Sequence, residues 1–242
     1  MSTIISTPLV RKASEVGRST RSAHVLENGD RLTRAEFMRR WEATPATKRA
    51  ELIEGIVFMA AAVRIREHGE PHGWLGNLLS TYAFRSRGLI YGDNSTVGLD
   101  PDNAPQPDSC LILPSQLGSK ARINDEGYLE GPPDLVGEVA ASSVSIDLHK
   151  KLQVYRRNGV REYLVWRVFD EAVDWFVLKN DEYVALAVDE GVLKSTIFPG
   201  LWLDPQAPVA RDFGRLCAAL DRGMSTDAYR AFRQQLDAIA GQ

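Results

Sequence analysis

Short apolar runs separated by turn residues dominate the middle of the chain, and they predict strands. Two such runs flank the pair Glu54-Gly55, which predicts a tight β-hairpin. Runs rich in β-branched and aromatic residues predict further strands at 89–91, 95–99, 109–113, 135–139, 161–166, 172–178, 182–188 and 192–196. We expect the last four of these to form an antiparallel meander that extends one central sheet.

Helical periodicity and capping residues predict helices at both ends and twice in between. The expected ranges are 32–41, 71–87, 146–158, 212–220 and 226–239. Thr33 and Glu36 have capping-box spacing, and Pro71 suits the first turn of a helix. Residues 142–145 can cap the third helix, and Gly159 can end it.

This order of hairpin, helix, strands, helix and strands predicts a mixed α/β (α+β) fold in which helices flank one central sheet. We expect a loosely attached N-terminal extension over 1–28, because that segment is polar and without periodicity. A main domain should follow over 29–205, with a C-terminal helical extension over 206–242.

Composition narrows the range of functions. The formal net charge of −3 argues against a histone-like protein that binds DNA through a general surplus of basic residues, but it is compatible with a local basic groove. No apolar run approaches the roughly 20 residues that span a bilayer, so we expect no membrane association and a cytoplasmic location. Cys110 and Cys217 follow no metal or redox motif, and we interpret Cys110 as a small buried hydrophobe.

Two acidic residues stand out in the strand pattern. Asp108 leads into the strand at 109–113, and Glu138 lies inside the strand at 135–139. Alternation puts Glu138 and Ala140 on one face of the sheet and Val139 on the other. A carboxylate among apolar neighbours needs a charged partner or a metal. The other interpretation of Glu138 is an edge residue that faces solvent or pairs with an arginine.

A lysine on the next predicted helix completes the pattern. At 100° per residue, Lys151 borders the apolar stripe that contains Tyr155, whereas Lys150 points away. The Lys151 ammonium can bend toward the sheet, where it would orient water or stabilise charge in a transition state. Alternatively it forms an ordinary helical pair with Asp147, four residues earlier.

These residue types fit hydrolysis of a phosphodiester with a hard cation. Mg²⁺ (or Mn²⁺) takes oxygen ligands and commonly binds one or two carboxylates, which Asp108 and Glu138 can supply. Lys151 would assist the reaction. His72, in the first turn of its predicted helix, is either a boundary residue or a member of the same site.

Several motifs occur in an order that resembles the Uma family of restriction-endonuclease-like proteins, a branch of the PD-(D/E)XK nuclease superfamily. The motifs are Glu51-Leu52-Ile53-Glu54-Gly55, Gln106-Pro107-Asp108, Pro133-Asp134-Leu135-Val136-Gly137-Glu138-Val139, Asp147-x3-Lys151-x3-Tyr155, Gly159-Val160-Arg161-Glu162-Tyr163 and Phe198-Pro199-Gly200-Leu201. His72 falls where the family's first helix often carries a histidine. The resemblance covers roughly residues 45–205.

The resemblance implies a restriction-endonuclease-like core, dependence on Mg²⁺ and DNA as the substrate. Asp108 matches the family's PD aspartate and Glu138 its second acidic residue. Where the superfamily usually has a lysine two residues after that acid, this chain has Ala140. The family often offers a lysine on the following helix instead, which here is Lys151. The chain also departs from the family at Ala141-Ser142-Ser143, at the entry to this helix, and at Trp166-Arg167.

Two other functions stay open on sequence grounds. A catalytically degenerate nuclease fold would act as a nucleic-acid-binding or regulatory module, which suits the acidic charge balance. A two-carboxylate glycosidase has no use for Lys151 and finds no aromatic-rich cleft in the sequence. For a DNA endonuclease we further expect a homodimer, since cutting two strands favours two sites related by twofold symmetry.

Overall fold

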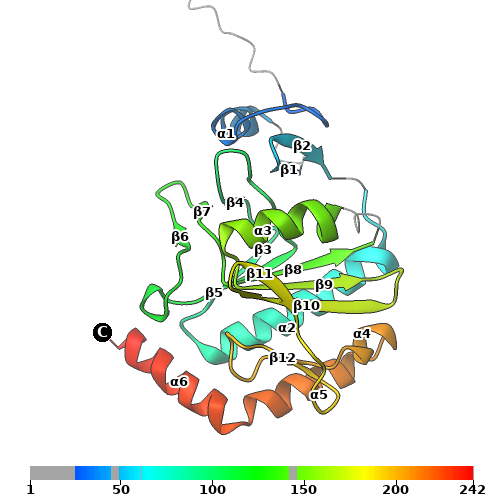
Figure 1. Cartoon of the computed structure of the whole chain (residues 1–242), viewed down its shortest axis with the longest axis vertical. Coiled ribbons are helices and arrows are strands. Elements are labelled where there is room, and N and C mark those ends of the chain that lie inside the picture. The colour runs from blue at the N-terminus through cyan, green and yellow to red at the C-terminus, as the bar shows by residue number, and fades with distance from the viewer. Residues whose placement is uncertain (1–24, 45–48, 61, 142–145, 242) are drawn as a thin grey trace, which may run out of the picture.

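A six-stranded mixed sheet forms the centre of the protein, and helices cover both of its faces (Figure 1). The computed structural model describes residues 25–44, 49–60, 62–141 and 146–241. In spatial order the strands are β11 (Glu182–Ala185), β10 (Ala172–Lys179), β9 (Glu162–Arg167), β8 (Leu135–Ala140), β5 (Ser109–Ile112) and β3 (Ile90–Asp93). This arrangement confirms the predicted α+β fold with one central sheet.

The β8–β9 pair is parallel, and the other pairs in this sheet are antiparallel. Parallel neighbours need a crossover connection over one face of the sheet. Here that connection is the π-helical turn η3 (Ile146–Lys151) followed by the helix α3 (Leu152–Asn158), which ends at Gly159 with φ of 84°. The helix predicted over 146–158 is therefore confirmed, while its expected cap at 142–145 lies outside the described residues.

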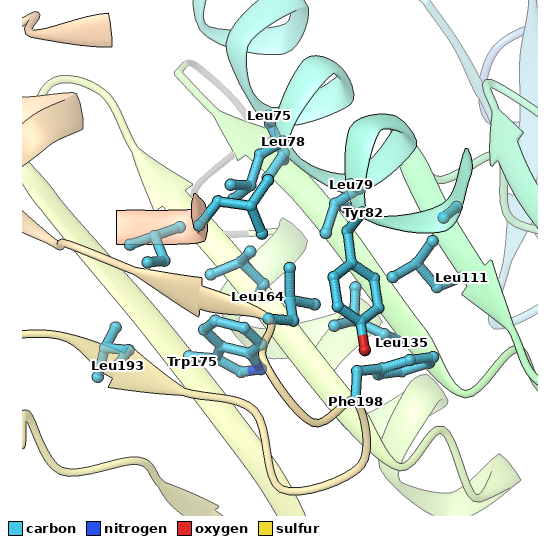
Figure 2. Close-up of a cluster of buried hydrophobic side chains, with 14 of the residues drawn as sticks. Leu75, Leu78, Leu79, Tyr82, Leu111, Leu135, Leu164, Trp175, Leu193 and Phe198 are labelled. Atoms are coloured by element: carbon cyan, nitrogen blue, oxygen red, sulfur yellow. The ribbon is translucent and has the colours of Figure 1, made fainter. Parts of the chain in front are cut away.

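The opposite face carries the larger hydrophobic core. Its helices are α2 (Glu70–Ser86), α4 (Gln206–Val209), α5 (Phe213–Met224) and α6 (Asp227–Ala240), and the π-helical turn η1 (Ile65–Gly69) leads directly into α2. Leu75 and Leu79 of α2 point into this core (Figure 2). Both lie over Gly137, where a Cβ atom would come within 3.2 Å of Leu75. Leu216 of α5 and Phe232 of α6 belong to the same core, so the predicted C-terminal helices pack against the main domain. No helix in the described ranges is long and apolar enough to cross a membrane.

A second, smaller core joins the N-terminal elements. The predicted helix α1 (Arg34–Ala43) and the predicted hairpin of β1 (Ala50–Ile53) and β2 (Ile56–Met59) are both present, and the structure shows that they pack together. The Thr33 side chain accepts a hydrogen bond from the backbone N–H of Glu36 and so caps α1. Residues 1–24 of the expected N-terminal extension lie outside the described residues. Leu26, near the end of that extension, is buried in this core.

Short strands complete the fold in two small sheets. One sheet contains β4 (Val97–Gly98), β6 (Arg122–Ile123) and β7 (Leu129–Glu130), with the 3-10 turn η2 (Ser115–Leu117) nearby in the chain. The other pairs β12 (Leu193–Lys194) with β13 (Trp202–Leu203). The predicted meander is confirmed for β9, β10 and β11 but was wrong for β12, which leaves the central sheet. Hydrogen bonds from residues 195–197 to Glu162 hold the chain after β12 near the start of β9.

Candidate active site

The register of β5 and β8 brings Asp108 and Glu138 together. Ser109 lies opposite Gly137 in this antiparallel pair, so one step further along places Asp108 opposite Glu138. The backbone N–H of Val139 donates to Asp108 Oδ2 at 2.8 Å, and the backbone N–H of Asp108 donates to Glu138 Oε2 at 3.4 Å. The two predicted carboxylates are therefore neighbours at one end of the two strands.

The side chains of β8 alternate between the two faces, as the sequence predicted. Val139 belongs to the core beneath α2, whereas Ala140 packs with Tyr155 of α3 on the opposite face. Glu138 faces α3 as well, since its Oε1 accepts a hydrogen bond from the Tyr155 hydroxyl at 2.9 Å. Ala140 is fully buried, so apolar packing fills the position two residues after the acid.

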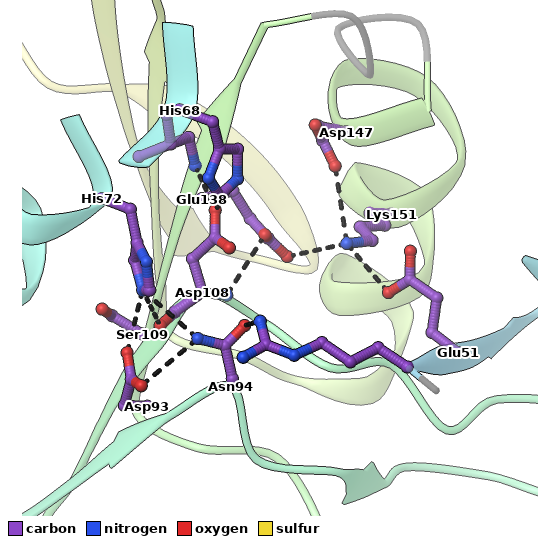
Figure 3. A network of polar contacts seen from close by, with 12 residues as sticks. Glu51, His68, His72, Asp93, Asn94, Asp108, Ser109, Glu138, Asp147 and Lys151 are labelled. Atoms are coloured by element: carbon purple, nitrogen blue, oxygen red, sulfur yellow. Dashed lines mark hydrogen bonds and ion pairs between the residues drawn. The ribbon is translucent and has the colours of Figure 1, made fainter. Parts of the chain in front are cut away.

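Lys151 lies at the centre of a group of three carboxylates (Figure 3). Its Nζ is 3.1 Å from Glu138 Oε1, 2.9 Å from Glu51 Oε2 and 3.5 Å from Asp147 Oδ1. Only 5% of the residue is exposed. The ammonium therefore reaches the sheet carboxylate as expected and also contacts its helical neighbour Asp147; the catalytic role expected of Lys151 stays a prediction. Lys150 is exposed and lies over the Phe58 ring at 5.1 Å, as its opposite direction predicted.

Three members of this group were not predicted as site residues. Glu51 comes from β1, where it signalled only a hairpin. Asp147 signalled only a helical pair with Lys151, yet it is buried. Tyr155 belonged to the apolar stripe, and no sequence signal placed its hydroxyl on Glu138. Two sequence signals group Asp147, Lys151 and Tyr155: their spacing at every fourth residue of a helix, and the motif that they form in the resemblance to the Uma family.

Two histidines line the other side of Asp108. His68, in η1, places Nε2 at 3.4 Å from Asp108 Oδ2. His72 places Nε2 at 3.1 Å from the backbone carbonyl of Asp108 and at 2.8 Å from Asp93 Oδ1. Of the two interpretations of His72, the structure therefore favours membership of the site. His68 was not predicted, although its position four residues before His72 on a helical segment puts both rings on one side.

The residues around Glu138 carry more negative than positive charge. Burial raises the pKa of Glu138 well above its ordinary value, and nearby Asp147, Asp108 and Glu51 add to this effect while Lys151 opposes it. Such a surplus of buried negative charge favours the binding of a cation.

The pKa values of Lys151 and Asp108, two charged neighbours of Glu138, are shifted in opposite directions. Burial acts to lower the pKa of Lys151, but the carboxylates of Glu138, Glu51 and Asp147 outweigh it and raise that pKa well above 10.5. Burial acts to raise the pKa of Asp108, but the hydrogen bond from His68 and further interactions lower it below 3.8. Asp108 is thus held as a carboxylate and Lys151 as an ammonium ion.

Comparisons with known proteins concern the family and the fold. No curated protein matches the chain. Among solved structures, one similar chain is described as "a putative nuclease belonging to DUF820 from Anabaena variabilis ATCC 29413". It has a TM-score of 0.57 and 14% sequence identity, and the match covers 78% of this chain and 99% of the other. At that identity the likeness shows the fold alone.

A family profile gives the stronger match. The profile of the Uma2 family, described as "Putative restriction endonuclease", matches residues 34–206. That span includes both sheet carboxylates, both histidines and Lys151, and it confirms the resemblance that the ordered motifs indicated. By this match over most of its length, the chain belongs to the Uma2 family.

Proposed function

We propose that the protein is a metal-dependent endonuclease that hydrolyses DNA phosphodiester bonds. One observation carries the proposal: the β5–β8 register sets Asp108 opposite Glu138 on a face where Lys151 contacts Glu138 at 3.1 Å. The family and the fold support a restriction-type nuclease. Catalytic activity, dependence on a metal and DNA as the substrate are our own proposals beyond the family and the fold.

The donor set fits a hard cation. Asp108 keeps 11% of its side chain exposed, and among the described residues Glu138 Oε2 receives only a long hydrogen bond from the Asp108 backbone. Mg²⁺ or Mn²⁺ needs oxygen ligands and commonly takes one or two carboxylates besides water and substrate. We therefore assign Asp108 and Glu138 as the residues that would hold the ion. When bound, such an ion activates the attacking water and offsets charge on the phosphate.

Lys151 serves best as a positioning residue. Its ammonium is buried and surrounded by Glu51, Glu138 and Asp147, so it faces carboxylates instead of an open substrate site. It stabilises Glu138 as an anion and fixes the direction of that side chain. This role differs from the sequence hypothesis, in which Lys151 itself orients water or stabilises the transition state.

A different cation is available to the substrate. Arg49 is exposed, and its guanidinium donates to Asn94 Oδ1 at 3.0 Å. Asn94 in turn lies next to His72 (Figure 3). A guanidinium matches the geometry of a phosphate group and keeps its charge at any working pH. We assign Arg49 as a contact to the DNA backbone beside the scissile bond.

The alternative function is a nuclease fold that binds but does not cut. Burial of Lys151 among carboxylates and the net charge of −3 favour it, because neither feature offers a cation to the reacting phosphate. A measurement of DNA cleavage distinguishes the two functions. The alternative predicts saturable Mn²⁺ binding that Glu138→Ala loses, without any cleavage of DNA.

Cleavage of supercoiled plasmid with Mg²⁺ or Mn²⁺ tests the proposal. The wild type should nick or linearise the plasmid, and Asp108→Ala should not. Asp102→Ala, which changes an exposed aspartate in a nearby turn, is the matched control and should cut like the wild type. Equal cleavage by Asp108→Ala and the wild type would remove Asp108 from the mechanism. Calorimetry with Mn²⁺ on the same proteins reports binding independently of cleavage.

We also propose that the active form is a homodimer, because each chain offers one such site and duplex DNA has two strands to cut. Sedimentation equilibrium of the purified protein gives the mass directly. A mass of twice 26.9 kDa supports pairing. A monomer that still makes double-strand breaks contradicts it.

A further inference from the structure

His68, His72 and Asp108 form a group whose chemistry differs from that of the two acidic residues. One ring nitrogen of each histidine and one carboxylate oxygen of Asp108 all lie within 4.8 Å of one another. We infer that these three side chains form a second metal position, suited to a transition-metal dication that prefers nitrogen ligands. Zn²⁺ is the probe that tests it.

The backbone explains why the two rings meet. His68 lies in the π-helical turn η1 and His72 in the first turn of α2, which continues η1 without a break. Residues four apart on a helical segment are neighbours on its surface, and two such histidines are a common zinc-binding pair. The ring centroids are 5.6 Å apart. Asp108, directly before β5, lies beside the two histidines, with Oδ2 at 3.4 Å from His68 Nε2 (Figure 3).

The ligand types select the ion. Imidazole nitrogen suits zinc and similar metals, whereas Mg²⁺ prefers an all-oxygen set. Two histidines and one carboxylate leave coordination positions open for water or a phosphate oxygen, as in catalytic zinc sites. The side chains of His68 and His72 are 25% and 21% exposed, so an ion can reach them from solvent.

Neighbouring residues support a metal here. Asp93 Oδ1 lies 2.8 Å from His72 Nε2, and a ligating histidine usually bonds a carboxylate through its other ring nitrogen, so we assign Nδ1 of His72 to the ion. Within the described residues, Lys151 forms its ion pairs with Glu51, Glu138 and Asp147. The positive charge of Lys151 therefore lies on the Glu138 side, away from the histidines.

The inference concerns binding and rests on the proposed function only through Asp108, which would serve both positions. Loss of Asp108 therefore cannot separate them, but variants on either side can. Glu138→Gln removes a ligand from the proposed Mg²⁺ position and leaves both histidines intact. His68→Gln and His72→Gln do the reverse.

Calorimetric titration of the full chain with Zn²⁺ alone tests the inference. Zn²⁺ should bind the wild type and Glu138→Gln with similar affinity. In His68→Gln and in His72→Gln the affinity should fall at least about 10-fold, since loss of even an outer-shell partner of zinc typically costs that much. His149→Gln, which changes an exposed histidine of η3, is the matched control and should bind like the wild type.

Zn²⁺ binding that is equal in the wild type, His68→Gln and His72→Gln overturns the inference. Circular dichroism of each variant checks that the fold is intact, and the partial exposure of both rings makes these substitutions tolerable. Plasmid cleavage is scored separately. Histidine-dependent Zn²⁺ binding without cleavage would contradict the nuclease alone, and cleavage without histidine-dependent binding would contradict the second metal position alone.

Discussion

Two buried glutamates on adjacent parallel strands have opposite environments. Glu138 of β8 faces α3, whereas Glu162 of β9 lies opposite Leu135 in the register, on the face that α2 covers. Burial raises the pKa of both. The same residue type at a similar depth therefore has a different role on each face of one sheet.

The difference lies in their partners. Glu162 accepts hydrogen bonds from neutral donors: Trp175 Nε1, the Ser195 and Thr196 hydroxyls, and the backbone N–H groups of Thr196 and Ile197. These bonds satisfy the carboxyl and tie the loop after β12 to the sheet. Glu138 also accepts from the Tyr155 hydroxyl and the Asp108 backbone N–H, but unlike Glu162 it shares a lysine with two other carboxylates. A satisfied carboxyl holds structure, and a carboxyl within a negative surplus is ready for a cation.

The sharpest test of this comparison is Glu138→Gln against Glu162→Gln. We expect Glu138→Gln to lower the plasmid cleavage rate about 10³-fold, as loss of a key electrostatic group typically does. Its unfolding free energy should not fall, since it removes one of several crowded negative charges. Glu162→Gln should cut like the wild type. Initial rates at fixed Mg²⁺ check both, and similar rates for the two variants would break the comparison.

Lys151→Met should destabilise the fold. It removes the ammonium from three buried carboxylates, and breaking a buried ion pair by deleting one partner costs about 3 kcal/mol or more. Lys150→Met, which loses only an exposed cation–π contact with Phe58, should cost under about 1 kcal/mol. Urea unfolding of both variants measures the difference. Equal losses would show that Lys151 has no special electrostatic role.

Glu162→Ala should cost about 2 kcal/mol of unfolding free energy, since a buried donor left without its acceptor typically costs about 1–3 kcal/mol. The backbone N–H groups of Thr196 and Ile197 would be such donors. Urea unfolding checks the size of the loss. Calorimetry should show Mn²⁺ binding unchanged, because Glu138 lies on the other face. A loss of Mn²⁺ binding here would mean that the two glutamates are coupled.

The smallest expected effect is on pH dependence. The pKa of Glu162 is raised above 4.5 in the folded protein by burial, so the folded state binds this proton more tightly than the unfolded chain. Its contribution to stability is therefore full below about pH 4.5 and is lost as pH rises through the folded-state pKa. The stability of the wild type relative to Glu162→Gln should fall in that direction. Urea midpoints across pH check the sign, and a rise would contradict it.

Local patterns determined much of the candidate site. Alternation along β8 predicted that Glu138 and Ala140 lie on the same face of the sheet. Helical periodicity predicted that Lys151 and Lys150 point in different directions. Both predictions hold, because side-chain direction follows from backbone geometry alone. The capping residues of α1 and the glycine that ends α3 were predicted for the same reason.

Only the tertiary structure decided which distant residues join them. Glu51 contacts Lys151 from the hairpin of β1 and β2, which belongs to the smaller N-terminal core. His68 contacts Asp108 from η1, the turn that precedes α2. Asp147 of η3 is a buried carboxylate and not a surface partner, because η3 and α3 together pack on the sheet. Periodicity predicts the direction in which a side chain points, whereas strand order and helix packing determine which residues it contacts. The charge surplus around Lys151 arises from those long-range contacts, and no local pattern contains it.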